Sequence, residues 1–203
     1  MVVGLGTGST AKFAVEEIGR RLDSGELSGI VGIPTSIHTG RLAESFGIPV
    51  SSLEEYTALD LTIDGADQID PQGNLIKGGG GALLWEKIVA TASRRLLIVA
   101  DESKLVTRLG ESFPLPVEVV AFGWRTHEAP LRELGAEPAL RCDAAGRPFL
   151  TDSGHYIVDC RFRGGMADPE LVERAIVGRP GVVETGLFLG MRPEVFVGRS
   201  ESG

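Results

Sequence analysis

Apolar and polar positions alternate along the first 120 residues in a pattern that predicts strands and helices in turn. Short runs rich in Val, Ile and Leu predict strands, and apolar residues three or four positions apart predict helices. The expected strands are 1–4, 29–34, 48–51, 59–64 and 95–100, and the expected helices are 10–23, 36–46 and 81–93. This alternation is typical of a parallel sheet with helices on both faces, in the α/β class.

The pattern changes after PLPVEVV at 114–120. Two helices are expected at 126–135 and 168–177, and strands at 137–141, 148–151, 155–160 and 182–189. These elements indicate a smaller α+β domain of the split β-α-β type. A strand at 194–198 is expected to return to the first sheet. We therefore expect residues 1–123 and 189–203 to form the larger sheet domain and residues 124–188 to form the small domain.

Composition narrows the classes of partner and compartment. Among 203 residues, 42% are hydrophobic and 24% are charged, as in ordinary globular proteins, and the formal charge is −8. This charge argues against nucleic acid or an anionic membrane as a partner, whereas a small anionic substrate remains compatible with it. No apolar run is long enough to span a bilayer, and no leader segment precedes the first motif. The expected location is the cytoplasm.

Cysteine and histidine are too few and too scattered for a metal site. The two cysteines, Cys142 and Cys160, are expected to be reduced core residues, and their spacing fits no zinc motif. The three histidines have no acid or nucleophile patterned around them. We therefore expect no metal ion.

Candidate chemistry lies in glycine-rich and acidic loops that follow predicted strands. These loops are GLGTGST at 4–10, DGADQID at 64–70 and DESK at 101–104, and KGGGG at 77–81 opens a predicted helix. The carboxyl ends of parallel strands share one edge of a sheet, where ligands bind. Glycines leave backbone N–H groups uncovered, and a helix N-terminus attracts anions.

GLGTGST fits neither of the common nucleotide-binding motifs. It gives G-x-G-x-G instead of G-x-G-x-x-G, no acidic residue ends the second strand, and no Gly-Lys-Ser/Thr closes the loop. Two interpretations remain open. Thr7, Ser9 and Thr10 bind a phosphate or sugar hydroxyls, or Ser9 or Thr10 only caps the following helix.

Several charged side chains are candidates for catalysis or binding. Asp64 and Asp67 flank two small residues, so both carboxylates can turn to one loop space. Glu86 follows the glycine run within a helix, and burial there raises the pKa of a carboxyl group, which suits a general base. Lys77 and Lys104 supply positive charge for a phosphate or an oxyanion.

The order and spacing of GLGTGST, DGAD, KGGGGALLWEK, DESKLV, PLPVEV and GVVETGLF resemble ribose-5-phosphate isomerase of the A type over nearly the whole chain. The resemblance implies a Rossmann-like sheet domain with a small ferredoxin-like domain. It implies cofactor-free interconversion of D-ribose 5-phosphate and D-ribulose 5-phosphate in the pentose phosphate pathway. It also implies a homo-oligomer, a dimer or a tetramer.

Residue by residue, the resemblance implies that Glu86 is the catalytic base. It implies three substrate-binding loops and one further substrate-binding lysine, which together are Thr7, Gly8, Ser9, Thr10, Asp64, Gly65, Ala66, Asp67, Lys77, Gly78, Gly79, Gly80 and Lys104. Either Asp64 or Asp67 is expected to exchange a proton with the sugar when its ring opens, and the sequence does not choose between them.

The sequence departs from the family pattern in two places that matter for the site. The family has an N-terminal helix of roughly twenty residues with a lysine near the phosphate, whereas here Met1-Val2-Val3 leads directly into the glycine loop. We therefore expect a very short first strand or a missing upstream segment. In addition, Gln68 stands where the family usually has Glu after DGAD.

Two other classes of protein compete with the isomerase. Related sheet domains act as sugar-phosphate sensors in transcriptional regulators, but these need no base and usually carry a helix-turn-helix, which the sequence does not show. A nicotinamide-dependent dehydrogenase would need the ribose-binding acid that is absent here.

Overall fold

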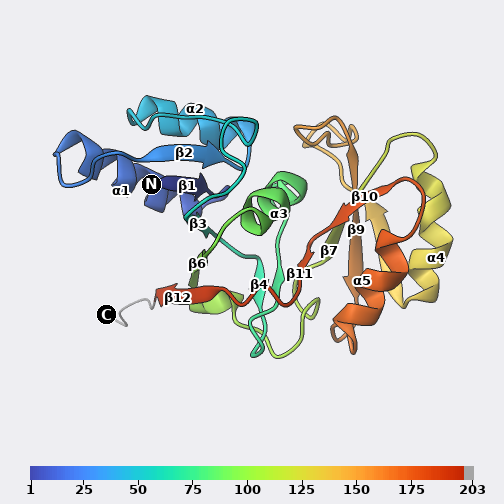
Figure 1. Ribbon diagram of the computed structural model, residues 1–203. Helices are drawn as coiled ribbons and strands as arrows, with labels where there is room; N and C mark the ends of the chain where they lie inside the picture. Colours follow the sequence, from blue (N-terminus) through green and yellow to red (C-terminus); the bar gives the residue numbers. More distant parts are fainter. Residues whose placement is uncertain (199–203) are drawn as a thin grey trace. The chain divides into compact units, whose positions relative to one another are not determined.

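The computed structural model describes residues 1–198, and the chain divides into two compact units (Figure 1). The first unit contains Met1–Ala66, Trp85–Glu102 and the described residues from Met191 to Gly198. The second contains Asp67–Leu84 and Ser103–Gly190. The chain thus passes between the units four times.

The first unit is built on a parallel sheet of five strands in the order β12-β6-β3-β1-β2. Its strands are β1 (Val2–Leu5), β2 (Val31–Pro34), β3 (Leu61–Asp64), β6 (Leu96–Asp101) and β12 (Glu194–Gly198). Its helices are α1 (Ala11–Asp23), α2 (Ile37–Ser45) and α3 (Leu83–Thr91), the last of which begins in the second unit. The expected parallel α/β sheet is confirmed.

Successive side chains of β1 explain why helices cover both faces of this sheet. Val3 and Leu5 pack with Val15 of α1 and Ala43 of α2 in one apolar cluster. Gly4, which points to the opposite face, lies against Val89 of α3. Because side chains alternate along a strand, a single tetrapeptide serves both layers.

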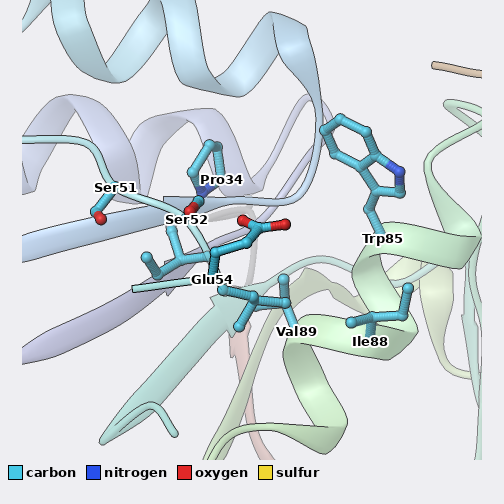
Figure 2. Close-up of a pocket in the computed structure, with 9 residues that line it drawn as sticks. Pro34, Ser51, Ser52, Glu54, Trp85, Ile88 and Val89 are labelled. Atoms are coloured by element: carbon cyan, nitrogen blue, oxygen red, sulfur yellow. The ribbon is translucent and has the colours of Figure 1, made fainter. Parts of the chain in front are cut away.

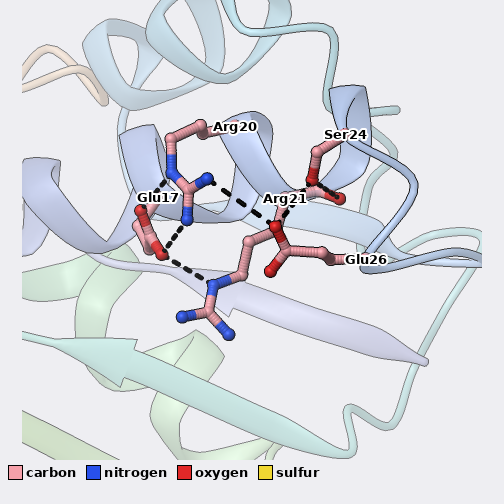
Figure 3. Close-up of polar contacts among 5 residues, drawn as sticks. All are labelled: Glu17, Arg20, Arg21, Ser24 and Glu26. Carbon is pink, nitrogen blue, oxygen red and sulfur yellow. Dashed lines mark hydrogen bonds and ion pairs between the residues drawn. The ribbon is translucent and has the colours of Figure 1, made fainter.

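The outer face of α1 is held by ion pairs at helical spacing (Figure 3). Glu17 accepts hydrogen bonds from the guanidinium groups of Arg20 and Arg21, three and four positions further on. These hydrogen bonds lower the pKa of Glu17 to about 2. The pairs are solvent-exposed, so they support the helix only weakly.

The second unit contains a ferredoxin-like β-α-β-β-α-β arrangement. Its antiparallel sheet has the order β10-β7-β9-β8. In chain order the elements are β7 (Leu115–Val119), η2 (Trp124–His127), α4 (Glu128–Glu133), β8 (Ala136–Leu140), β9 (Tyr156–Phe162), α5 (Pro169–Val177) and β10 (Val182–Thr185). This confirms the ferredoxin-like domain.

A smaller antiparallel sheet completes the second unit. It has the order β11-β5-β4, with β4 at Gln68–Ile69, β5 at Leu75–Ile76 and β11 at Leu187–Phe188. Ile76 and Leu187 belong to the same apolar core as Leu115, Val117 and Val119 of β7. The two sheets of this unit therefore share one core.

The expected domain ranges, 1–123 with 189–203 and 124–188, differ from the compact units. Residues 67–84 and 103–123 belong to the second unit because their strands pair there: β7 lies between β9 and β10, and β4 and β5 pair with β11. Part of the range 189–203 lies outside the described residues. The run of five apolar and charged residues in β7 indicates a strand but not its partner.

Three expected strands are also corrected. The segment 48–51 makes only a single bridge, between Val50 and Gly32, and the segment 148–151 makes only one, between Pro148 and Cys142. The segment 182–189 is divided into β10 and β11 at Gly186, whose N–H still donates to the Pro116 carbonyl of β7 while its carbonyl accepts from the Lys77 N–H. None of the helices in residues 1–198 has the length and apolar character needed to cross a membrane.

The two cysteines differ in environment. Cys160 in β9 is fully buried, and burial raises the pKa of its thiol to about 12, whereas Cys142 is exposed. Both are free thiols, as expected, but the prediction that both are core residues is wrong for Cys142.

The close approach at Gly4 makes a test of the sheet packing. A Cβ at this position would lie 2.0 Å from Thr62 Oγ1 and 2.6 Å from Val89 Cγ1. We expect Gly4→Ala to lower the free energy of unfolding by about 1–3 kcal/mol, measured by urea denaturation. Gly40→Ala in α2 is the matched control, because its Cβ would meet only ordinary contacts at 3.4 Å. A gain of up to about 1 kcal/mol is expected there. Equal losses at both sites would contradict this packing.

Thiol reactivity tests the different burial of the cysteines. In the native protein we expect one thiol, Cys142, to react with an aromatic disulfide reagent, because the thiolate is the reactive form and Cys160 is buried with a raised pKa. The second thiol should react only in denaturant. Cys142→Ser should abolish the native reaction, and two rapidly reacting thiols in the native protein would contradict the structure.

Candidate active site

The loop between β1 and α1 leaves several polar groups at its surface. Gly8 and Ser9 are exposed and Thr10 is partly buried, and Gly8 has a φ of +122°. Thr10 is the N-cap residue of α1, but its side chain makes no capping hydrogen bond. Helix capping therefore does not explain the Thr10 hydroxyl. The N–H groups of Lys12 and Phe13 donate to the carbonyls of Gly8 and Thr10, and the remaining N–H groups at a helix N-terminus attract anions.

Thr7 in the same loop turns its hydroxyl to the start of α2. Its Oγ1 lies 2.7 Å from Thr35 Oγ1, 2.8 Å from Ser36 Oγ and 3.0 Å from Thr39 Oγ1. Ser36 is the N-cap of α2 and accepts from the Thr39 N–H. These four hydroxyls, which we call the hydroxyl cluster, fasten the loop to the next strand-to-helix connection.

Asp64 closes the base of this loop at the end of β3. It is almost fully buried, and its Oδ1 accepts from the N–H groups of Thr7 at 3.2 Å and Gly65 at 2.7 Å. A Cβ on Gly6 would lie 2.2 Å from the same oxygen. Glycine at position 6 is thus required for the close approach of Asp64. Gly65 and Ala66, which follow, are half-buried.

Glu86 lies in the first turn of α3 and is 4% exposed. The preceding residue, Trp85, and the following Ile88 and Val89 line a pocket of about 270 Å³ together with the segment 51–54 (Figure 2). At about 100° per residue, Val89 lies about 60° from Glu86 around α3, whereas Trp85 and Ile88 lie about 100° and 160° away, so the pocket is centred to one side of the Glu86 side chain. The apolar contacts of Val89 fix the helix and hence the position of the carboxylate.

The second unit carries Asp67 and Lys77 on adjacent chain segments. Gln68 pairs with Ile76 in the antiparallel ladder, and the Asp67 N–H donates to the Ile76 carbonyl at 2.8 Å, so Asp67 and Lys77 lie at the same end of β4 and β5. Asp67 is half-buried and Lys77 is 3% exposed. The Lys77 ammonium lies 5.6 Å from the centre of the Phe188 ring. A buried lysine is rare, which singles out Lys77 among the cations of the chain.

The glycine run begins directly after Lys77. Gly78 has a φ of +104°, which only glycine adopts readily, while Gly79 and Gly80 are exposed. The Gly79 N–H donates to Asp67 Oδ2 at 2.8 Å, and a Cβ on Gly79 would lie 2.6 Å from Asp67 Oδ1. The run is therefore shaped to receive the Asp67 carboxylate.

Lys104 is half-buried at the end of the short helix η1 (Glu102–Lys104). The chain after it is attached to β4, since the Val106 N–H donates to the Ile69 carbonyl at 3.0 Å. Within the first unit, hydrogen bonds connect Asp64 with Thr7 and Gly65, and within the second unit a hydrogen bond connects Asp67 with Gly79.

The departure at Gln68 has a structural reason. Gln68 is 1% exposed, its Nε2 donates to Ser112 Oγ at 2.7 Å, and its Oε1 accepts from the Gly110 N–H at 2.6 Å. An amide supplies both a donor and an acceptor at one place, which a carboxylate does not. Residues 1–198 contain no group of three or more His, Cys, Asp or Glu side chains arranged to hold a metal ion.

Comparison with known proteins identifies the family. Residues 31–202 match the sequence model of the family described as ribose 5-phosphate isomerase A (phosphoriboisomerase A). The chain is 56% identical over 198 residues to ribose-5-phosphate isomerase A of Gloeobacter violaceus, which is 97% of this chain and 84% of the relative. It is 54% identical over 191 residues to the enzyme of that name from Roseiflexus castenholzii, 94% of this chain and 81% of the relative. The chain belongs to the ribose-5-phosphate isomerase A family.

A solved structure of a D-ribose-5-phosphate isomerase in complex with phospho-erythronic acid has the same fold. It superposes with a TM-score of 0.95 at 40% sequence identity, and the match covers 99% of this chain and 88% of that one. The expected α/β class and the family resemblance are therefore confirmed.

Sequence reasoning missed the part of the hydroxyl cluster that lies outside the first loop. Thr35, Ser36 and Thr39 are buried, and in this member of the ribose-5-phosphate isomerase A family they hold the loop through Thr7. The available signal was the Thr35-Ser36 pair directly after a strand, with a hydroxyl residue three positions on, which is the spacing of an N-cap and its N3 partner.

Paired threonine substitutions test how the first loop is held. Thr7→Val removes a hydroxyl that meets three others within the cluster, so we expect the free energy of unfolding to fall by about 1–3 kcal/mol in urea denaturation. Thr10→Val is the matched control in the same loop, and its effect should stay within about 0.5 kcal/mol. Similar losses for both variants would show that the hydroxyl cluster is not what fixes the loop.

Proposed function

We propose that this chain interconverts D-ribose 5-phosphate and D-ribulose 5-phosphate without a cofactor, with Glu86 as the general base. The observation that carries this proposal is a nearly fully buried glutamate in the first turn of a helix that follows a four-glycine run. Buried ionisable side chains are uncommon, and in a site they are candidates for proton transfer. Family membership supplies the substrate.

The reaction moves one proton from C2 to C1 and a second proton from the C2 hydroxyl to the C1 oxygen. A base removes the proton from C2 of the open-chain aldose, which gives a cis-enediol(ate), and the same carboxyl group returns the proton to C1. Glu86 is assigned this role because a carboxylate shielded from water is a stronger base for carbon acids than a solvated one. Such a base contributes about 10²–10⁴-fold to the rate.

The developing negative charge of the enediolate needs donors or a cation. Lys77 and the N–H groups of Gly78 and Gly80 are assigned to this charge, since a buried ammonium and preorganised amides are effective in a site with little water. The Gly79 N–H donates to Asp67 Oδ2, so Gly79 is assigned to holding the Asp67 carboxylate toward the sugar. The carboxylates of Asp64 and Asp67, with Gly65 and Ala66 between them, are assigned to the sugar hydroxyls and to proton exchange during ring opening.

The phosphate is assigned to the loop between β1 and α1. Gly8, Ser9 and Thr10 offer N–H groups and hydroxyls at the start of α1, and Thr7 holds this loop in position through the hydroxyl cluster. Lys104 adds a positive charge for the substrate. Fixing a remote phosphate orients the reacting carbons, which lowers the entropic part of the barrier.

The chemistry of a ligand bound by a relative supports this assignment. Phospho-erythronic acid, present in the solved isomerase structure, combines a phosphate with a planar carboxylate. A planar carboxylate matches the shape and charge of an enediolate. Molecules that imitate a reaction intermediate bind more tightly than the substrate.

The cellular setting follows from the same proposal. Two free thiols suit the reducing cytoplasm, where the enzyme would serve the non-oxidative branch of the pentose phosphate pathway. We also propose a homo-oligomer. Phe122 is 93% exposed and Val120 two positions earlier is 40% exposed, and such apolar groups suit a contact between copies of the chain.

The decisive experiment compares wild type with Glu86→Gln in the formation of ribulose 5-phosphate from ribose 5-phosphate, with no added metal. We expect the wild type to turn over and the variant to lose at least about 100-fold in kcat, because an amide cannot accept the proton. Phospho-erythronic acid should still raise the melting temperature of Glu86→Gln, which separates loss of chemistry from loss of the fold.

Glu133→Gln is the matched control, since the same chemical change is made at an exposed position of α4 and should leave kcat unchanged. Undiminished activity in Glu86→Gln would remove the base assignment. Binding of the sugar phosphate by the wild type without any turnover would favour a sensor.

A further inference from the structure

The guanidinium of Arg141 is held by a carboxylate of the neighbouring strand. Arg141 follows β8 directly, and Asp159 lies within β9. Nε of Arg141 donates to Asp159 Oδ2 at 2.9 Å and Nη2 donates to Oδ1 at 2.5 Å, a two-point contact. The two side chains are only 13% and 22% exposed. Paired N–H donors of this kind fix both the position and the plane of a guanidinium.

The remaining face of this guanidinium contacts the glycine run. Nη1 donates to the carbonyl of Gly78 at 2.8 Å and to the carbonyl of Gly79 at 3.2 Å. The Phe149 ring lies 5.9 Å from the guanidinium carbon and also packs against Gly81, where a Cβ would come within 2.5 Å of the ring. Arg141 is therefore clamped between Asp159 and the loop that carries the proposed donors.

Because the peptides are planar and trans, the contacts of the two carbonyls with Arg141 also fix where the Gly79 and Gly80 N–H groups point. In a trans peptide the carbonyl and the following N–H point in opposite directions. The Gly78 carbonyl faces Arg141, and the Gly79 N–H on the other side of that peptide donates to Asp67 Oδ2. The Gly79 carbonyl also faces Arg141, so the Gly80 N–H points away from Arg141.

We propose that Arg141 and Asp159 form a positioning pair that aims the Gly79 and Gly80 N–H groups for the isomerase reaction. The inference rests on the proposed function of the glycine run. Arg141 itself does not touch the sugar: it holds two carbonyls, and the N–H groups opposite them then serve Asp67 and the enediolate oxygens.

The pair also strengthens these donors. A cation at a carbonyl oxygen polarises the peptide and makes its N–H a better donor, as in chains of cooperative hydrogen bonds. Asp159 balances the charge of Arg141, so the pair adds little net field and its effect stays local. Lysine could replace the charge of Arg141, but its single ammonium group could not replace the contacts that Nε, Nη1 and Nη2 make with Asp159 and the loop.

A single neutral substitution of Arg141 would lower the stability of the protein and release the glycine run at the same time. Removing Arg141 alone leaves the Asp159 carboxylate partly buried without its partner, which destabilises a protein in its own right. A double variant, Arg141→Met with Asp159→Asn, removes both charges together. The double variant can therefore regain stability although it lacks the hydrogen bonds from Arg141 to the glycine run.

The test measures kcat, KM and melting temperature for wild type, Arg141→Met, Arg141→Lys and the double variant. We expect Arg141→Met to lose both stability and activity. The double variant should regain most of the melting temperature, yet its kcat should remain at least about tenfold below wild type, because the amides are no longer aimed. Arg141→Lys should fold and show an intermediate kcat, with a smaller change in KM.

Arg163→Gln with Glu137→Gln is the matched control, because this pair also joins the β8 and β9 segments but is exposed and makes no contact with the glycine run. Its kcat should equal that of wild type. Wild-type kcat in the double variant, or in Arg141→Lys if the double variant does not fold, would overturn the inference and leave the proposed function intact. No turnover by wild type would overturn both.

Discussion

The candidate site depends on one kind of interaction, a carboxylate that accepts backbone N–H groups from a glycine-containing loop. Asp64 holds the loop after β1 through the Thr7 N–H, and Asp67 holds the glycine run through the Gly79 N–H. In both cases a glycine stands where any Cβ would collide with the carboxylate. The pairing of acid and glycine is therefore a steric requirement, and the loops keep their shape only while both members are present.

The two acid–glycine contacts lie in different compact units of the chain. Asp64 and Asp67 are three residues apart but belong to different compact units, and Glu86 lies two residues beyond the point where the chain returns to the first unit. Short strands such as β4 and β5 allow these returns, since two residues are enough to make one antiparallel contact and to turn back. The functional segments thus coincide with the passages between units.

Hydrophobic periodicity was enough to predict the parallel sheet, its helices and the position of Glu86 after the glycine run. It could not assign β7, because a fully buried strand of five residues such as LPVEV has no pattern that distinguishes a parallel from an antiparallel sheet. It could not reveal two-residue strands such as β4, which have no period. The Arg141–Asp159 pair was equally hidden, since it is defined by the register of β8 and β9 and by contacts with residues more than sixty positions earlier.

Ordering the glycine run explains why so many contacts converge on it. Fixing the backbone of one residue costs about 1–2 kcal/mol, and glycine loses more freedom than any other residue. Four consecutive glycines therefore form a loop that would not hold a single conformation by itself. Asp67 on one side, and Arg141 and Phe149 on the other, supply the hydrogen bonds and packing that offset this entropy. The amides proposed for the enediolate are left bare by glycines, and the glycines in turn are held by a rigid clamp from the ferredoxin-like sheet.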